Sequence, residues 1–495
     1  MTRRTLQGTI QRDAPEPLHA QLKTLIKEAI ENGRLRPGDR LPTEQQLCRE
    51  FGLSRTPVRQ ALQELVQDGL LVRIPGRGTF VAQRDVAPVK DGVVTLHVVT
   101  EPGWASPLQQ AALLWNHTHP YRRLRIVIEE VPYPRLRAHL MDRVAQGTAP
   151  DISLLDSAWV AEFAELGYLV SPDDISPDWE ARNAHNLLDT SLQANRYQNR
   201  LMAIPASVDI SVLWYRRDWL TNEGKAPPRT WEELVSLGRH FRKPEISLRY
   251  GRDTHGLVFV AGQRGGETTT YQLLPLLWNA GSEIIAGGHV VLNNKATIRF
   301  LEYLRSLIYE HHITPPDVVR YKWDQAARLF ARRQAVMAFG GLYEIQFMCQ
   351  ERGWSEKDFL HRVGIAPIPA GPAGQYGTLG GMSYAIYRQS RYPELALGVL
   401  EQTAHPSVTR LYWKETRHHT PWLNPQPTSR LAPFLAETAH LLRLGRPRPS
   451  IPEYTRVSEQ FRWLVEEALR EHADLNMLIS RAADRIAAIT RLPLL

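Results

Sequence analysis

The apolar positions of residues 18–31 recur at the spacing of one helix face. These positions are Leu22, Leu25, Ile26, Ala29 and Ile30. Gly33 follows them, where a glycine commonly ends a helix. We therefore expect an amphipathic helix from Leu18 to about Gly33.

A second, shorter helix is predicted between Thr43 and Gly52. Thr43 and Gln46 have the spacing of a capping box, in which each side chain bonds to the other residue's backbone N–H. Gly52 then supplies the stop signal.

A third helix is predicted from Ser54, as its cap, to about Asp68. The apolar positions expected to face inward are Val58, Ala61, Leu62 and Leu65. This pattern leaves Arg55, Thr56 and Arg59 on the outer side of the first turn. In a helix-turn-helix, the second helix reads the major groove of DNA with its N-terminal residues.

A short hairpin follows the three helices. Its strands are expected at residues 70–73 and 79–81, across the turn Pro75-Gly76-Arg77-Gly78. Arg73 and Arg77 then place positive charge where a wing meets DNA phosphates. Taken singly, each arginine is explained equally well by a solvated surface.

In this order the segment resembles the N-terminal winged helix of GntR-family transcription regulators. The matching runs are Pro17-Leu18, Arg36-Pro37-Gly38-Asp39-Arg40-Leu41-Pro42-Thr43-Glu44, Ser54-Arg55-Thr56-Pro57-Val58-Arg59 and Gly76-Arg77-Gly78-Thr79-Phe80-Val81. The resemblance implies that Arg55, Thr56 and Arg59 contact operator DNA, and that Thr43 and Glu44 lie at a phosphate-facing helix start. Gln45 departs from the arginine that several members have there. The full set of candidate DNA-binding residues is Thr43, Glu44, Ser54, Arg55, Thr56, Arg59, Arg73, Gly76, Arg77 and Gly78.

Beyond residue 92 the pattern changes to apolar strands that alternate with helices. Strands are expected at 93–99, 124–128 and 151–155, which predicts a parallel α/β sheet. Ligands of such sheets lie outside the carboxyl ends of the strands. The residues expected at that edge are Glu101, Trp104, Asp156 and Ser157.

Several later blocks, in order, resemble the family 1 extracellular solute-binding proteins, the sugar-capturing subunits of ABC importers. They include Ala149-Pro150-Asp151-Ile152, Leu201-Met202-Ala203-Ile204-Pro205, Thr230-Trp231-Glu232-Glu233-Leu234, the run 330–343 and Gly380-Gly381-Met382-Ser383-Tyr384. The resemblance implies a two-lobed α/β domain of the type II periplasmic-binding-protein kind, with a ligand cleft between the lobes. The multidomain α/β chain is thus expected to divide into an extension (1–16), a winged helix-turn-helix (17–84), a linker (85–92) and a two-lobed effector domain (93–495).

Sugars are bound by aromatic faces and by polar groups that pair with hydroxyls. The aromatic candidates are Trp104, Trp278 and Tyr343, with Trp422 behind them. Asp156 and Asp209 each follow an apolar strand, although an aspartate there also caps helices. Gly380 and Gly381 allow a ligand close to the backbone, or simply form a tight turn.

Other features restrict the picture. The net charge of +8 permits a nucleic-acid partner without proving one. No apolar run reaches the roughly 20 residues of a membrane-spanning helix, so we expect a cytoplasmic protein that does not associate with a membrane. The histidine pairs 311–312 and 418–419 lack metal-site spacing and are expected at the surface, and the basic run 443–449 is expected to be a solvated loop. Neither a cofactor nor a metal ion is expected.

The sequence therefore predicts a ligand-responsive, non-catalytic transcription regulator. It is expected to bind a near-palindromic operator as a homodimer, with a sugar or oligosaccharide between the lobes that switches its DNA affinity. One alternative is a catalytic C-terminal domain. An aminotransferase-like domain needs a Schiff-base lysine in a suitable setting, and a glycosidase needs facing carboxylates, for which Asp156 and Asp209 could be imagined. Another alternative is a LacI-like sensor.

Overall fold

The computed structural model describes residues 10–11, 17–31, 34–35, 39–67, 70–74, 78–81, 93–120, 122–416, 418–422 and 438–495. The expected linker, 85–92, lies outside these residues, as does most of the expected extension, 1–16. The described residues up to 81 form a small N-terminal head, and those from 93 onward form a larger body.

The head is a winged helix-turn-helix. Its elements are α1 (Leu18–Glu31), α2 (Glu44–Phe51), α3 (Arg55–Gln67), β1 (Leu71–Ile74) and β2 (Gly78–Val81), the strands pairing antiparallel. The expected capping box is present, with the Thr43 side chain accepting from the Gln46 N–H and the Gln46 side chain from the Thr43 N–H. Gly52 ends α2 in the left-handed conformation. The expected inward residues of α3 are all buried, so the amphipathic pattern placed this helix correctly.

The first lobe of the body is built on a sheet with the strand order β4-β3-β5-β18-β6. The strands are β3 (Val93–Thr100), β4 (Arg123–Glu130), β5 (Ile152–Asp156), β6 (Leu169–Val170) and β18 (Met382–Tyr387). β3 and β5 are parallel as expected, but β18 lies antiparallel to β5 and β6. The sheet is therefore mixed, because a strand from a distant part of the chain returns into it antiparallel.

Helices surround this sheet. They are α4 (Ala105–Thr118), α5 (Tyr133–Ala145), α6 (Val160–Glu165), α7 (Pro172–Ile175), α8 (Trp179–Asn183), α9 (Asp189–Ala194), α18 (Pro393–Glu401) and α19 (Pro406–Thr416). The strand pair β7 (Arg196–Tyr197) and β8 (Arg200–Leu201) completes the lobe. No helix in the described residues is both long and apolar enough to cross a membrane.

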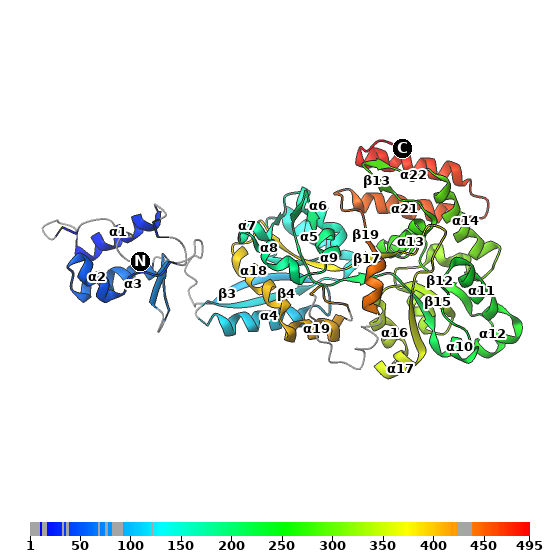
Figure 1. The fold of residues 1–495 in the computed structure, drawn as a ribbon, viewed down its shortest axis with the longest axis horizontal. Coiled ribbons are helices and arrows are strands. Elements are labelled where there is room, and N and C mark those ends of the chain that lie inside the picture. Colours follow the sequence, from blue (N-terminus) through cyan, green and yellow to red (C-terminus); the bar gives the residue numbers. More distant parts are fainter. Residues whose placement is uncertain are drawn as a thin grey trace. The chain divides into compact units, whose positions relative to one another are not determined.

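The second lobe has a four-stranded sheet of order β12-β15-β11-β16. These strands are β11 (Val212–Arg216), β12 (His255–Val258), β15 (Ala335–Gly340) and β16 (Val363–Pro367). Its helices are α10 (Arg217–Asn222), α11 (Trp231–Arg242), α12 (Pro244–Tyr250), α13 (Glu267–Ala280), α14 (Lys295–Tyr309), α15 (Gln325–Ala331), α16 (Ile345–Arg352), α17 (Glu356–Arg362), α21 (Tyr454–Ala468) and α22 (Leu475–Thr490). Figure 1 shows α21 and α22 packed together beside α14. A hairpin of β13 (Ile285–Ala286) and β14 (His289–Val290) lies on this lobe.

Crossing segments join the lobes through a small sheet of their own. β9 (Ile204–Pro205) pairs in the first lobe, and β10 (Asp209–Ile210) follows it into a three-stranded sheet with β17 (Gly377–Gly380) and β19 (Gly445–Pro447). β17 in turn continues into β18 of the first lobe. The crossing strands are therefore hydrogen-bonded to one another at the lobe boundary.

Candidate ligand-binding site and DNA interface

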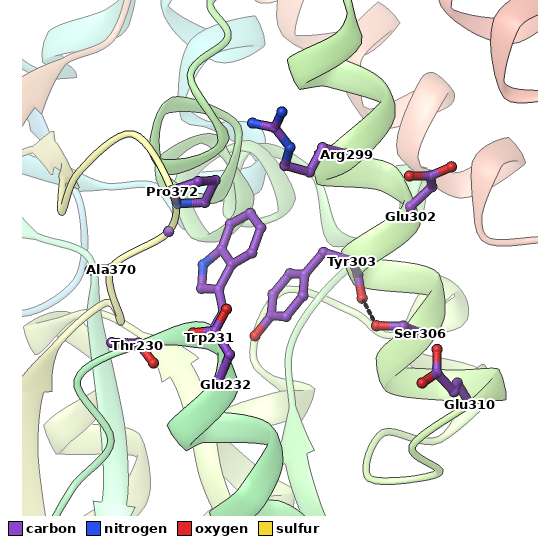
Figure 2. Close-up of a pocket in the computed structure, with 11 residues that line it drawn as sticks. Thr230, Trp231, Glu232, Arg299, Glu302, Tyr303, Ser306, Glu310, Ala370 and Pro372 are labelled. Carbon is purple, nitrogen blue, oxygen red and sulfur yellow. Dashed lines mark hydrogen bonds between the residues drawn. The ribbon is translucent and has the colours of Figure 1, made fainter.

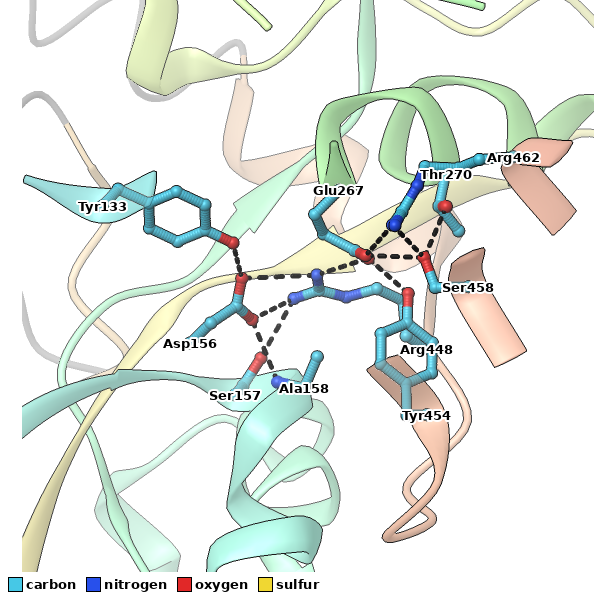
Figure 3. A network of polar contacts seen from close by, with 10 residues as sticks. All are labelled: Tyr133, Asp156, Ser157, Ala158, Glu267, Thr270, Arg448, Tyr454, Ser458 and Arg462. Atoms are coloured by element: carbon cyan, nitrogen blue, oxygen red, sulfur yellow. Dashed lines mark hydrogen bonds and ion pairs between the residues drawn. The ribbon is translucent and has the colours of Figure 1, made fainter. Parts of the chain in front are cut away.

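A buried arginine bridges the two lobes. Arg448 follows the crossing strand β19 and is only 7% exposed. Its Nη2 lies 2.5 Å from Oδ1 of Asp156, and its Nη1 lies 3.0 Å from Oε1 of Glu267. Asp156 ends β5 in the first lobe, whereas Glu267 begins α13 in the second. One cation thus neutralises a carboxylate from each lobe (Figure 3).

Further donors hold both carboxylates of this cluster. Asp156 accepts hydrogen bonds from the Tyr133 hydroxyl (2.6 Å) and the Ala158 N–H (2.9 Å), so it caps a short helix and faces the lobe boundary at once. The ring of Tyr133 is stacked on Trp159, with 5.2 Å between centroids. Tyr133 is buried among these charges, and burial raises the pKa of its hydroxyl.

On the second lobe, Glu267 is bound from three sides. It accepts hydrogen bonds from the hydroxyls of Tyr454 and Ser458, the latter at 2.7 Å. Nη1 of Arg462 lies 3.6 Å from its Oε2. The paired carboxylates and guanidinium groups balance in charge, which is the condition for burying ions.

The position of Arg448 corrects one prediction. The basic run 443–449 was expected to be a solvated loop, yet residues 445–447 form β19 and Arg448 is buried. Residues 445–447 pair in parallel with β17 and form the edge strand of the crossing sheet. Burial of Arg448 follows from partners that the local sequence does not contain.

Glu101 and Trp104 follow β3, as expected, but differ in their surroundings. Burial, together with the charge of Asp156, raises the pKa of the Glu101 carboxyl to about 7. Trp104 is buried and packs against the rings of Tyr412 (5.8 Å) and His418 (5.3 Å). Trp104 therefore packs the first lobe, whereas Glu101 lies within the electrostatic range of the cluster.

The histidine pair 418–419 is partly buried instead of lying freely at the surface, which corrects a second prediction. Burial lowers the pKa of both rings to about 4, so both are neutral. The Nε2 atom of His419 lies 2.7 Å from the Thr438 hydroxyl. In the described part of the chain, no group of three or more candidate ligand side chains could hold a metal ion.

Asp209 lies at the start of β10, in the crossing sheet. Its carboxylate accepts hydrogen bonds from the N–H groups of Ile210 (2.8 Å) and Leu342 (3.1 Å). Burial nevertheless raises its pKa to about 6. The ring of Tyr343 follows the same turn and meets Tyr271 of α13 edge-on, with 5.9 Å between centroids.

Tyr271 is a candidate that the sequence analysis missed. It lies close enough to Asp209 to influence that carboxyl's pKa. Yet the hydroxyls of Tyr271 and Tyr343 are both buried without a hydrogen-bond partner of normal geometry among the described residues. Buried hydroxyls normally find partners, so this aromatic pair has unused capacity beside Asp209. α13 is buried along almost its whole length, so its residue pattern does not distinguish Tyr271 from ordinary core positions.

Gly380 and Gly381 allow the crossing segments to approach one another. Gly380 pairs with Asp209, and a Cβ on it would lie 2.9 Å from the Tyr271 ring. Gly381 has φ +143°, and a Cβ there would lie 2.3 Å from the Ser207 carbonyl oxygen. Ser157, also predicted at the site, donates its N–H to the Gly381 carbonyl (3.1 Å), and its hydroxyl lies 3.4 Å from Arg448 Nη2.

Trp278 lies in the core of the second lobe. Its Nε1 donates to Glu283 (2.8 Å), and the Arg446 guanidinium covers its ring at 4.8 Å. Trp422 is buried as well. The structure thus brings Asp156 and Ser157 together around Arg448, with Glu101 within electrostatic range of Asp156. It brings Asp209, Tyr343, Gly380 and Tyr271 together at the crossing sheet.

Two cavities lie elsewhere. A cavity of about 560 Å³ on the second lobe is lined by Trp231 and Tyr303, whose rings stack 3.9 Å apart, and by residues of α14 such as Arg299 and Glu302 (Figure 2). A second cavity, of about 410 Å³, lies beside Tyr215. Neither is lined by any predicted ligand residue, so cavity size does not mark the candidate site.

The head exposes the expected side chains at the start of α3. Ser54, Arg55, Thr56 and Arg59 are all exposed. The Nε of Arg59 lies 2.9 Å from Oε2 of Glu44, the first residue of α2, so these two candidates are paired with each other.

The wing is described only in part. Gly78 starts β2 with φ +122°, a conformation that favours glycine, and the backbone of Arg73 lies in β1. Gly76 and Arg77, also predicted to contact DNA, lie outside the described residues.

Two family models match the chain. Residues 18–81 match "Bacterial regulatory proteins, gntR family", and residues 101–401 match "Bacterial extracellular solute-binding protein". Both resemblances predicted from the sequence are thereby confirmed. The second match favours a solute-binding domain over the LacI-like alternative.

Individual relatives fall into the same two groups. The histidine utilization repressor of Klebsiella aerogenes is 29% identical over 42% of this chain and 88% of its own length. A probable ABC transporter-binding protein of Deinococcus radiodurans is 25% identical over 53% of this chain and 60% of its own length. The structure of maltose-bound MalE3 of T. maritima has a TM-score of 0.68 and 25% identity, and covers 80% of this chain and 100% of its own. The chain belongs to the bacterial extracellular solute-binding protein family and carries a gntR-family DNA-binding domain at its N-terminus.

Proposed function

We propose that this protein is a non-catalytic transcription regulator whose two-lobed body senses a small molecule. The observation that carries the proposal is the bridge between lobes, in which Arg448 binds Asp156 of one lobe and Glu267 of the other. Any ligand that changes the separation of the lobes must change this bridge. The same chain carries an exposed N-terminal turn of α3, through which a change in the body would alter DNA binding.

The proposed ligand is a sugar or oligosaccharide bound at the lobe boundary. Asp156, Asp209 and Glu101 supply carboxyl groups, and the Tyr271–Tyr343 pair supplies ring surface and two hydroxyls that have no hydrogen-bond partner of normal geometry among the described residues. The raised pKa values, about 7 for Glu101 and about 6 for Asp209, leave Glu101 partly protonated at neutral pH, so it can donate as well as accept a hydrogen bond with a sugar hydroxyl. The likeness to a maltose-bound protein agrees with this ligand class.

The proposed switch acts through a dimer. One winged helix covers half of a near-palindromic operator, so two chains related by a two-fold axis are required. A ligand that binds one lobe arrangement more tightly shifts the population toward it. A coupling of about 1–3 kcal/mol, typical of allosteric proteins, suffices for a transcriptional response.

A cytoplasmic location follows from the proposed contact with DNA. The matched families are a regulator family and a binding-protein family, which supports the absence of catalysis over an aminotransferase-like or glycosidase domain. Asp156 also accepts from Arg448, and Asp209 accepts from two backbone N–H groups, so neither carboxylate stands free for glycosidase chemistry.

The test uses the purified full chain and labelled DNA from upstream of its own gene. Fluorescence anisotropy at fixed salt is measured with and without a panel of mono- and maltooligosaccharides, alongside thermal shifts that report ligand binding. The proposal requires retained DNA and at least one sugar that changes its affinity. Failure to bind any duplex, or DNA binding that no stabilising sugar alters, contradicts it.

A further inference from the structure

β4 is the outermost strand of the first-lobe sheet. In the described part of the chain, no strand pairs with its outer side. Its exposed side chains alternate along one face. These alternating residues are Arg123, Arg125, Val127 and Glu129, and Glu130 at the end of the strand is exposed as well.

The hydrogen bonds at the two ends of β4 define which backbone groups point outward. The Val131 N–H donates to the Thr100 carbonyl (2.8 Å), so odd-numbered amides point toward β3 and even-numbered amides away from it. At Leu124 the outward N–H and C=O are both bonded by the Asn116 side chain, each at 2.8 Å. Ile126, Ile128 and Glu130 therefore direct their backbone N–H and C=O groups toward a further strand.

We propose that β4 is the dimer interface, paired antiparallel with β4 of a second copy about a two-fold axis at Val127. In this register Ile126 of each copy lies opposite Ile128 of the other, and each such pair exchanges both backbone hydrogen bonds. Asn116 ends the ladder at Leu124. Val127, 42% exposed, then meets its own copy on the axis.

Charge complementarity supports this register. β4 carries arginines at its start and glutamates at its end, so antiparallel pairing sets Arg125 directly opposite the partner's Glu129 on both sides of the axis. Arg125 has no ion partner among the described residues. Glu129 is bound by Arg143 (2.6 Å) and His139 (3.0 Å), yet its side chain stays 44% exposed. A second cation can therefore approach it.

The interface also fits the need for two DNA-reading heads, and in this respect it rests on the proposed function. β3, which begins at Val93 after the head, starts beside the start of β4. Antiparallel pairing of two eight-residue strands separates the two β3 starts by roughly 26 Å along the strands. This span is comparable to the roughly 34 Å between adjacent half-sites.

The test is the mass of the full-length chain by sedimentation equilibrium at micromolar concentration. Wild type is expected as a dimer, and Val127→Asp as a monomer of half that mass, because two carboxylates meet on the axis. Leu248→Asp, at an exposed leucine of α12, is the matched control and is expected to remain dimeric. Thermal unfolding followed by circular dichroism shows whether each variant is folded.

Charge reversal provides a second, independent variant. Arg125→Glu sets like charges opposite each other and is expected to weaken the dimer at least tenfold, and adding Glu129→Arg restores attraction and recovers the dimer. A dimeric wild type whose Val127→Asp and Arg125→Glu variants are equally dimeric overturns the interface but leaves the proposed function intact. A wild type that is monomeric also overturns it. DNA binding of wild type, measured separately, reports on the proposed function alone.

Discussion

Arg448 and Asp156 lie 292 residues apart in the sequence, yet their side chains form an ion pair of 2.5 Å. The pair is buried, and the same guanidinium reaches Glu267 in the opposite lobe. A single side chain on the crossing strand thus connects the end of β5 with the start of α13.

Replacing Arg448 with alanine is expected to destabilise the body strongly. The change leaves Asp156 buried without its cation and Glu267 with only Arg462 at 3.6 Å, and breaking a buried ion pair typically costs about 3–5 kcal/mol. Arg446→Ala is the matched control two residues away: Arg446 is 42% exposed and pairs with Glu283, so about 1 kcal/mol is expected. Urea unfolding followed by tryptophan fluorescence compares the two. Equal losses contradict a special role for Arg448.

Tyr271→Phe is expected to lower ligand affinity without lowering stability. The hydroxyl is buried and has no partner of normal geometry among the described residues, so its removal relieves a desolvation cost. If it binds the ligand, affinity falls by about 1 kcal/mol, or roughly fivefold. Isothermal titration is done with whichever sugar stabilises wild type most.

Tyr303→Phe is the control for that experiment. Its hydroxyl is likewise buried without a partner in the described part of the structure, but it lies at the cavity beside Trp231. This variant is expected to bind the sugar as wild type does. A loss of affinity in Tyr303→Phe but not in Tyr271→Phe would place the ligand in that cavity.

The stability of the body is expected to fall as pH rises toward about 8. Glu344 is fully buried, accepts a hydrogen bond from Trp214 Nε1 (2.8 Å), and has its pKa raised by burial to about 8 from 4.5. The folded state therefore holds a proton that the unfolded state releases. The protonated Glu344 contributes its full stabilisation below the pKa that it has in the unfolded chain, 4.5. This contribution is lost as the pH rises toward its folded-state pKa, and the free energy of unfolding falls by no more than about 1.4 kcal/mol per pH unit.

Glu344→Gln isolates this contribution. Glu101 and Asp209 act in the same direction, but only up to about 7 and about 6. Between pH values of about 7 and about 8, the variant is expected to show a flatter dependence of unfolding free energy than wild type. Glu310→Gln, at an exposed side chain, keeps the wild-type slope. A variant as pH-dependent as wild type would show that Glu344 is ionised in the folded protein.

Arg55→Ala is expected to weaken operator binding by about 1–3 kcal/mol if its guanidinium reads a base. The side chain is exposed on the first turn of α3. Arg49→Ala removes the same charge from an exposed position in the last turn of α2 and is the matched control. Both are measured by anisotropy at one salt concentration, and equal effects of the two changes contradict base reading by Arg55.

Local signals made the head predictable from sequence. Thr43 and Gln46 are three residues apart, so their capping interaction is complete within one helical turn. The inward positions of α3 also depend only on helical spacing.

Features that depend on distant partners were not predictable. Arg448 belongs to a run rich in proline and glycine that has no period, and only its pairing with Asp156 and Glu267 makes burial favourable. Tyr271 was hidden in a helix that is buried along almost its whole length.

The crossing sheet restricts how the body can move. Because β10, β17 and β19 are bonded side by side, they bend as one ribbon instead of three independent tethers. Such a ribbon flexes readily about one axis and resists twisting. Ligands of different length would then close the two lobes about the same axis but by different angles. The lobe movement is therefore expected to vary in size from ligand to ligand and to keep one direction.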